Sequence, residues 1–213
     1  MDAATFRTEL EESKRTELDR LGSNKLLIAL TDATLETGAV LRAAADSEHA
    51  ARRTFEAWAE DATGDAREAF AFVAEREADH ERRVLDALRA TTGEMYEPSD
   101  GGTLHSYLRE REGVVERAAA GLVGRATVSD RTHAQIVSFF VNEADEIRAD
   151  LFRALRTETE EELERGLELL DAHCETDEDW ERARMVAEYV VDVAYDDYAD
   201  ALKGLGVDVK PVC

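Results

Sequence analysis

Apolar residues recur along the chain at intervals of three and four, the spacing that places them on one face of an α-helix. Short polar segments with glycine interrupt this pattern at 22–24, 62–66, 91–103 and 124–131. We therefore expect one helix over about 3–21, a long helix beginning near Lys25, and a last helix over about 178–203. Ser129 or Asp130 would cap the helix that follows the 124–131 break.

The middle of the chain predicts two helical hairpins, 25–91 and 104–156, joined by a longer crossover. This connectivity is typical of a four-helix bundle whose hairpins pack face to face. We predict an all-α protein in three parts, an N-terminal helix (1–22), the bundle (23–157) and a C-terminal helical extension (158–213). The flanking parts could cover the bundle or mediate oligomers.

The composition agrees with an all-helical chain and adds an unusual charge. There are two prolines, and 49 acidic residues stand against 26 basic ones, of which four are lysines, for a net charge of -23. Acidity with few lysines resembles the proteins of salt-accumulating halophiles, whose surfaces stay soluble where salt screens self-repulsion. The charge is spread along the chain rather than gathered in a tail, and no basic patch offers a surface for nucleic acid.

Targeting and redox signals are few. No run of about 18 uncharged apolar residues predicts a membrane span, and the charged N-terminus has no apolar signal region. We expect a cytoplasmic protein without a membrane partner. Cys174 and Cys213 are far apart and no C-x-x-C occurs, so we expect two reduced thiols and neither a zinc knuckle nor a rubredoxin-type iron site.

Each helix of the predicted bundle carries an acidic residue where its apolar stripe calls for an apolar one. Several buried carboxylates facing one another would repel, and bound cations would remove the difficulty. Carboxylates with imidazole suit iron, manganese or zinc, and bridging carboxylates suit a two-metal site. The candidate ligands are Glu48 on the first helix, Glu77 and His80 on the second, Glu112 on the third, and Glu143 and Glu146 on the fourth.

The levels of these residues along the bundle agree. Glu48 lies 16 residues before Gly64 and His80 lies 16 after it, so both sit about 24 Å from the turn at a rise of about 1.5 Å per residue. Glu112 and Glu146 lie 17 residues on either side of Ser129. The four positions are therefore expected to meet in the bundle interior.

The first hairpin resembles a known pattern. The segment "DSEHAARRTFEAWAED", followed by "AEREADHERRVLDAL", is similar to the first hairpin of rubrerythrins and other ferritin-like di-iron proteins. Glu48 with Ala51-Arg52 matches the family's E-x-x-A-R, and Glu77 with His80 matches its E-x-x-H. The second hairpin should repeat the E-x-x-H, but "FFVNEADEIRADL" has Glu146 where the histidine belongs. The resemblance covers residues 46–156.

The resemblance implies a ferritin-like four-helix bundle that holds two iron ions, with manganese as the alternative metal. It implies peroxide reduction or ferrous iron oxidation in oxidative-stress defence, as a homodimer. Electrons would come from an external donor, because the cysteine-bound iron module of full-length rubrerythrins is absent.

A second hypothesis is a ferritin-like scaffold with a degenerate metal site, acting as a non-enzymatic binding or regulatory protein. Its core carboxylates would pair with arginines, or one would have a raised pKa. A subunit of a helical storage shell is a third, less favoured hypothesis. Whether the protein is an enzyme stays open at this point.

The remaining aromatic and imidazole groups are assigned structural positions. We expect His49, His105, His133 and His173 at the surface or at the boundary of the core. Tyr189, Tyr195 and Tyr198 predict a packing face on the last helix.

Overall fold

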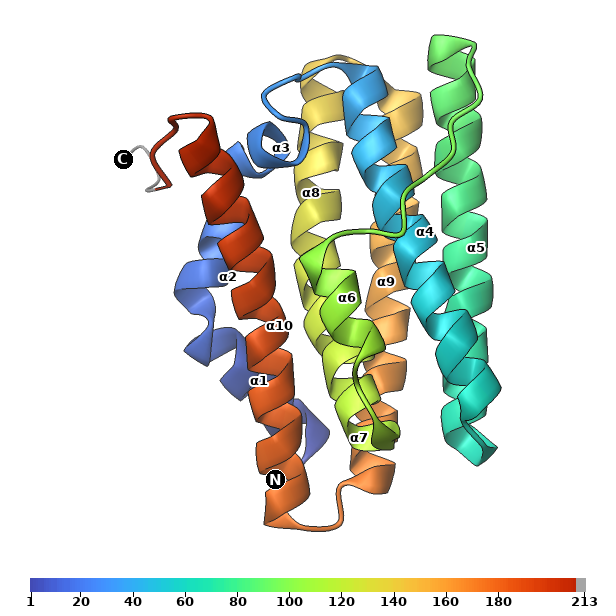
Figure 1. The fold of residues 1–213 in the computed structure, drawn as a ribbon, viewed down its shortest axis with the longest axis vertical. Coiled ribbons are helices and arrows are strands. Elements are labelled where there is room, and N and C mark those ends of the chain that lie inside the picture. Colours follow the sequence, from blue (N-terminus) through green and yellow to red (C-terminus); the bar gives the residue numbers. More distant parts are fainter. Residues whose placement is uncertain (210–213) are drawn as a thin grey trace.

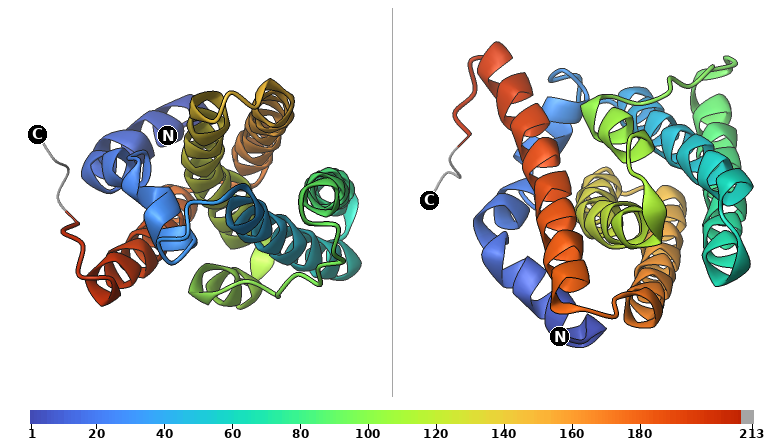
Figure 2. Two further views of the ribbon diagram at one scale, coloured as in Figure 1. Left: turned by 90° about the horizontal axis from the view of Figure 1, so that it is seen from above. Right: turned by 60° about the horizontal axis from the view of Figure 1, so that its bottom comes forward.

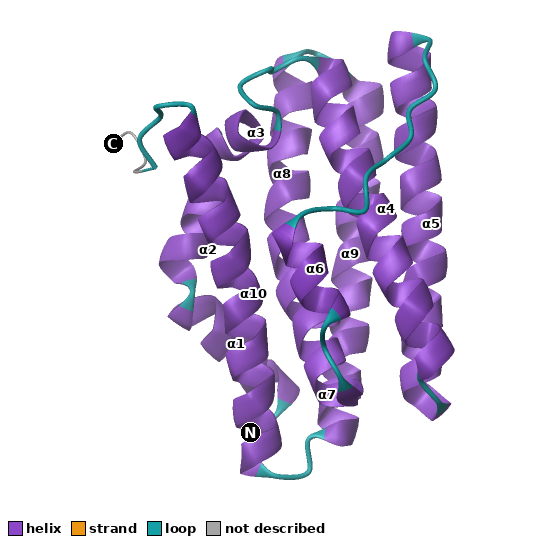
Figure 3. Ribbon diagram, in the orientation of Figure 1, coloured by secondary structure: helices purple, strands orange, loops and turns teal. Residues whose placement is uncertain are grey.

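The chain is all-helical in the computed structural model, which describes residues 1–209 and has no strand among them (Figure 3). The helices are α1 (Ala3–Ser13), α2 (Arg15–Leu21), α3 (Lys25–Leu30), α4 (Thr37–Asp61), α5 (Gly64–Thr92), α6 (Thr103–Arg109), α7 (Gly113–Arg117), the π-helical η1 (Ala118–Arg125), α8 (Ala126–Asn142), α9 (Glu146–His173) and α10 (Asp177–Gly204).

Four long helical segments form two antiparallel hairpins (Figure 1). The first hairpin is α4 with α5. The second pairs α9 with a helix that runs without a break through α7, η1 and α8, and α5 packs against α9. The chain crosses from the first hairpin to the second by the loop 93–102 and by α6. The last helix, α10, packs against η1, and α1, α2 and α3 pack against α10.

Small residues place η1 at the centre of the molecule. All eight residues of η1 are buried, and seven of them are alanine, glycine, leucine or valine, while the eighth is Arg125. A Cβ added at Gly121 would lie 2.5 Å from Trp58 on α4, and one at Gly124 would lie 3.0 Å from Val190 on α10. Seen from above, the long helix that contains η1 lies between α10 and the first hairpin (Figure 2).

A layer of polar side chains separates two apolar cores. One core surrounds η1 and α10, and the other fills the opposite end of the two hairpins. Seven buried polar residues form this layer, and none of them is more than 4% exposed. They are Glu48 on α4, Glu77 and His80 on α5, Arg125 at the end of η1, His133 on α8, and Thr159 and Glu162 on α9.

The first hairpin and the last helix confirm the sequence prediction. The predicted break at 62–66 matches the turn between α4 and α5, and the long crossover matches the loop after Thr92. The apolar stripes of both helices are buried together with Glu48, Glu77 and His80. The last helix spans Asp177–Gly204, against 178–203 expected.

The second hairpin was assigned a wrong turn. Residues 124–131 are helical, and the turn lies at residues 143–145. Gly124 suggested a break, but it serves the close contact with α10. The turn has its own signals, since Ala144 has φ +57° and the Asp145 side chain accepts a hydrogen bond from the backbone of Arg148. The predicted domain boundary at 157 therefore falls inside α9.

The helices at the N-terminal side are also shorter than predicted. The expected helix over 3–21 is divided at Lys14 into α1 and α2. The long helix expected from Lys25 ends at Leu30, and Asp32 and Ala33 with positive φ turn the chain before α4 begins. None of the helices in the described part of the chain has the length and apolar character that a membrane crossing requires.

Candidate metal centre

Three of the predicted ligands meet in the polar layer. Glu48, Glu77 and His80 each offer one atom to a group whose members lie within 4.8 Å of one another, and all three side chains are buried. Among the described residues this is the one cluster of acidic, histidine or cysteine side chains with such geometry. The α4–α5 hairpin builds it, because Glu48 stands at the level of Glu77 and His80 across the hairpin.

A carboxylate on α9 fixes the orientation of His80. The Nε2 of His80 lies 2.7 Å from Oε2 of Glu158, and Glu158 is held by Arg83, whose Nη2 is also 2.7 Å away. When Nε2–H donates to Glu158, Nδ1 faces the two glutamates and can bind a metal once it has lost its proton. This second-shell arrangement is the usual one for a histidine that binds a metal through its other nitrogen.

The atoms that face one another at the centre do not hydrogen-bond. Nδ1 of His80 is 3.6 Å from Oε2 of Glu48 and 3.7 Å from Oε2 of Glu77, too far for a hydrogen bond. Nδ1 of His80 and Oε2 of Glu77 are both buried without any hydrogen-bond partner. Ligand atoms about 2.1 Å from one ion at roughly tetrahedral angles lie about 3.4 Å apart, so the observed spacing fits a shared cation.

The second oxygen of Glu48 and of Glu77 is bound by a side chain from the helix that contains η1 and α8. Oε1 of Glu48 lies 3.1 Å from Nε2 of His133, and Oε1 of Glu77 lies 2.7 Å from Nη2 of Arg125. The same Nη2 lies 2.8 Å from Oε2 of Glu162 on α9. Each glutamate therefore directs one oxygen to the centre and the other to a nitrogen of η1 or α8.

The charges of this layer depend on its neighbours. Burial raises the pKa of Glu48, but His133 and His80 outweigh burial and hold it well below its usual range. Burial alone would lower the pKa of His80, yet Glu48 and Glu77 raise it to about 11. A metal must therefore displace a proton from His80. Burial, then the charge of Glu77, raises the pKa of Glu162 well above its usual range.

The other three predicted ligands do not reach the centre. Glu112 precedes α7, Glu143 follows α8 and Glu146 begins α9, and all three are exposed. The prediction that they face the core was wrong because it rested on a turn at 124–131. With the turn at 143–145, Glu143 and Glu146 lie at the end of the hairpin, and Ile147 beside them is 86% exposed.

Sequence reasoning missed the residues that the second hairpin contributes. The site residues that were not predicted are Arg125, His133, Glu158, Thr159 and Glu162. His133 and His105, expected at the surface or at the boundary of the core, are buried. A signal existed in α9, where Thr159 and Glu162 interrupt a stripe of buried apolar residues that continues on both sides. The correct turn was needed to recognise that this gap lies level with Glu77.

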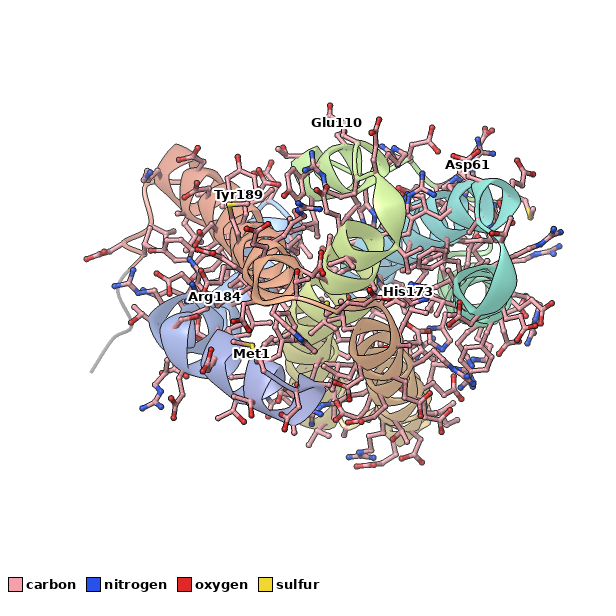
Figure 4. The ribbon with its side chains drawn as sticks, turned by 90° about the horizontal axis from the view of Figure 1, so that it is seen from below. Met1, Asp61, Glu110, His173, Arg184 and Tyr189 are labelled. Atoms are coloured by element: carbon pink, nitrogen blue, oxygen red, sulfur yellow. The ribbon has the colours of Figure 1, made fainter. Side chains whose placement is uncertain are left out.

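Other candidate groups are structural. His173, labelled in Figure 4 at the end of α9 that faces the viewer, lies 3.1 Å from Asp65 and outside the cluster. Cys174 is a half-buried free thiol, and burial, then Asp179 and Asp171, raises its pKa to about 11. Cys213 lies outside the described residues. Tyr189 and Tyr107 join α10 to α6 with ring centroids 4.8 Å apart, and Tyr198 is buried.

Comparison of the chain with protein-family models, with curated proteins and with solved structures found no match.

Proposed function

We propose that this protein is a ferritin-like four-helix metalloprotein that binds one divalent transition metal ion through Glu48, Glu77 and His80. Iron and manganese are the ions of choice, because two carboxylates and one imidazole form a ligand set of intermediate hardness. The two hairpins, α4–α5 and α7–α9, would be the four helices of the ferritin-like bundle.

One observation carries this proposal. Two polar atoms that face each other, His80 Nδ1 and Glu77 Oε2, are buried without a hydrogen bond, while the other polar atom of each side chain is held by a specific partner, Glu158 or Arg125. A buried, unpaired donor or acceptor costs about 1–3 kcal/mol. A cation coordinated by both atoms would remove that cost for each of them.

Arg125 supports one ion rather than two. Its guanidinium lies 2.7 Å from the outer oxygen of Glu77 and 2.8 Å from Glu162, so it already neutralises charge beside these two carboxylates. The arginine supplies the positive charge that a second metal would bring. We therefore infer a mononuclear centre in place of the two-iron centre that the resemblance implied.

The protein side chains have distinct roles in this centre. Glu48, Glu77 and His80 would coordinate the ion, Glu158 would keep the His80 ring in place, and His133 and Arg125 would fix the glutamates. A bound iron or manganese would supply electron exchange with peroxide or with a ferrous ion as substrate. Electrons for repeated peroxide reduction would come from an external donor.

The test compares two histidine variants. His80→Ala removes the proposed ligand, and His49→Ala removes a half-buried histidine of the same hairpin that contacts Glu81 and Asp100 instead. We expect a cobalt(II) titration of the wild type and of His49→Ala to end at one equivalent with a visible d–d spectrum. In His80→Ala we expect no such spectrum. Peroxide consumption and ferrous oxidation by the iron-loaded protein should be retained in His49→Ala and lost in His80→Ala.

A second candidate function is a metal-free scaffold that binds another molecule. Its support is that Arg125 pairs with Glu77 and Glu162 and that burial raises the pKa of Glu162, both of which reduce buried negative charge without an ion. Under this proposal the wild type would bind neither cobalt, iron nor manganese. Arg125→Met would then destabilise the protein by about 3 kcal/mol or more, and metal would not rescue it.

A further inference from the structure

A pocket of about 540 Å³ lies beside the polar layer, on the side away from α5. It is lined by residues of α3, α4, α6, α8 and α10 and by residues of the crossover loop. Its volume falls in the range of about 300–1,000 Å³ that is usual for pockets that bury small organic molecules. Arg125 belongs both to its wall and to the layer, where it contacts Glu77.

Small side chains at inward positions of three helices create the space. On α4, Ala43, Ala44 and Ser47 line the pocket at the spacing of one helical face. Ser129 and Thr132 do so on α8, and Ala194 and Ala201 on α10. Small side chains at these positions leave unfilled the volume that larger ones would occupy, so space remains between the helices.

The wall of the pocket is apolar along much of its surface. The large apolar side chains that line it include leucines of α2 and α3 together with Val40 and Ile136, and Leu30 among them is partly exposed. A ligand that fills this part of the pocket must therefore be mainly aliphatic.

Two nitrogen-bearing side chains give the pocket a polar end. His105 on α6 lines it, is 5% exposed, and has an Nδ1 without a hydrogen-bond partner. Its ring is fixed by the loop, since a Cβ at Gly101 would lie 2.8 Å from its Cδ2. The hydrogen bonds of Arg125 run from Nε and Nη2, so Nη1 is not used in them. An unpartnered imidazole nitrogen beside a guanidinium is a site for an acceptor group, above all a carboxylate.

The acidic residues of the pocket limit the charge that it accepts. Asp46 is already engaged, because its carboxylate accepts hydrogen bonds from the Tyr96 hydroxyl and from the backbone N–H of Ser99. Burial raises the pKa of Asp197. These two carboxylates at the wall disfavour a multiply charged ligand such as a phosphate ester, so a single negative charge is the better match.

We propose that this pocket binds a small aliphatic monocarboxylic acid, with its chain among the leucines of α3 and its carboxylate at Arg125 and His105. The proposal concerns reversible binding and does not depend on the metal. Because Arg125 holds Glu77, a bound carboxylate would lie one residue away from the centre proposed above.

Octanoate is a suitable probe, and isothermal titration in the presence of a chelator separates this test from the test of the metal site. We expect one octanoate per chain and about tenfold weaker binding of 1-octanol, because the alcohol cannot form the charge-assisted hydrogen bonds. Equal affinities would overturn the assignment of the polar end. Binding of neither compound to the folded, chelated protein would overturn the pocket proposal and leave the metal proposal untouched.

Two leucine variants locate the bound probe. Ala43→Leu extends a side chain into the pocket, whereas Ala57→Leu adds the same atoms at an exposed position of the same helix. We expect Ala43→Leu to weaken octanoate binding about tenfold or more and Ala57→Leu to leave it within about twofold, with both variants folded by circular dichroism. Equal affinity of the two variants would place the probe elsewhere on the protein and contradict the proposal.

His105→Leu tests the polar end without disturbing Arg125. It should reduce the preference for octanoate over 1-octanol, because the imidazole nitrogen is lost while the apolar wall is kept. An unchanged preference would show that His105 does not contact the carboxylate and would overturn that part of the proposal.

Discussion

Glu77 illustrates how single residues define the candidate centre. One of its oxygens lies 2.7 Å from the Arg125 guanidinium, and the other faces His80 without a hydrogen bond. A carboxylate that served stability alone would be expected to have both oxygens satisfied, since hydrogen bonding is the rule for buried polar groups. Because the oxygen that faces His80 lacks a partner while the other contacts Arg125, we place the cation on the His80 side.

Glu158 is a positioning residue whose removal should weaken the metal site without abolishing it. In Glu158→Gln the side chain keeps its size but loses the charge that orients His80 Nε2–H. We expect a metal affinity about 10–100-fold lower at unchanged stoichiometry, measured by competition with a chromophoric chelator. Glu161→Gln, at an exposed residue paired with Arg76, is the control and should bind metal as the wild type does. Full affinity in Glu158→Gln would contradict this role.

His105 should make the protein sensitive to acid. Burial, then the positive charges of Arg125 and Arg109, lowers the pKa of His105 from 6.5 to about 3. Between those values the unfolded chain takes up a proton that the folded protein cannot, so stability is lost as the pH falls below 6.5.

The acid effect can be isolated with a variant that does not titrate. Between pH 7 and pH 5 the wild type should lose about 2 kcal/mol of unfolding free energy more than His105→Gln does, in urea titrations of the metal-free proteins. His173→Gln, at a more exposed histidine, should lose as much as the wild type. Parallel pH profiles for the wild type and His105→Gln would show that His105 titrates normally in the fold.

At the scale of single helices, the π-helical η1 depends on glycine for its central position. Gly121 is in contact with Trp58 and Phe55, and a Cβ there would lie 2.5 Å and 3.1 Å from these rings. We expect Gly121→Ala to destabilise the protein by about 1–3 kcal/mol in chemical denaturation, because large aromatic groups must move. Gly204→Ala, at the end of α10 with open space around it, should have little effect or a small stabilising one. Equal stability of the two variants would mean that the core around η1 adapts freely.

The helices also show what the sequence could and could not predict. The first hairpin was predicted with its buried Glu48, Glu77 and His80 because a short turn at residues 62–63 joins two long, regular apolar stripes. In the second hairpin, Gly124 and the Ser129-Asp130 pair imitate a helix end, yet tertiary contacts keep this segment helical. Local propensity cannot reveal such contacts, and the long-range packing of α10 on η1 decided the outcome.

With the turn known, the sequence would have pointed to the correct layer. Counting 16 residues from Ala144, the interval that relates Glu48 and His80 to Gly64, leads to residues 128 and 160. These positions lie between Arg125 and His133 on one helix and between Thr159 and Glu162 on the other. Counting residues from the turn therefore identifies the correct layer, and the error came from the predicted position of the turn.

For the whole molecule, the net charge of -23 predicts that stability depends on salt. Self-repulsion between surface carboxylates is long-ranged in dilute buffer and is screened to a few ångströms in molar salt. We expect the melting temperature to rise by about 5 °C or more between 0.1 and 2 M KCl, at about 2–4 °C for each kcal/mol gained. Glycerol at matched viscosity is the control, and a melting temperature independent of salt would remove the halophile-like interpretation of the composition.

The direct test of the central claim is the metal content of the intact protein, purified in molar salt without a chelator and measured by elemental analysis after exposure to ferrous or manganous ions. One ion per chain, lost in Glu77→Gln, is the result that a mononuclear centre at Glu48, Glu77 and His80 predicts. Two ions per chain would contradict the role assigned to Arg125, and a folded protein that retains none would contradict the metal centre itself.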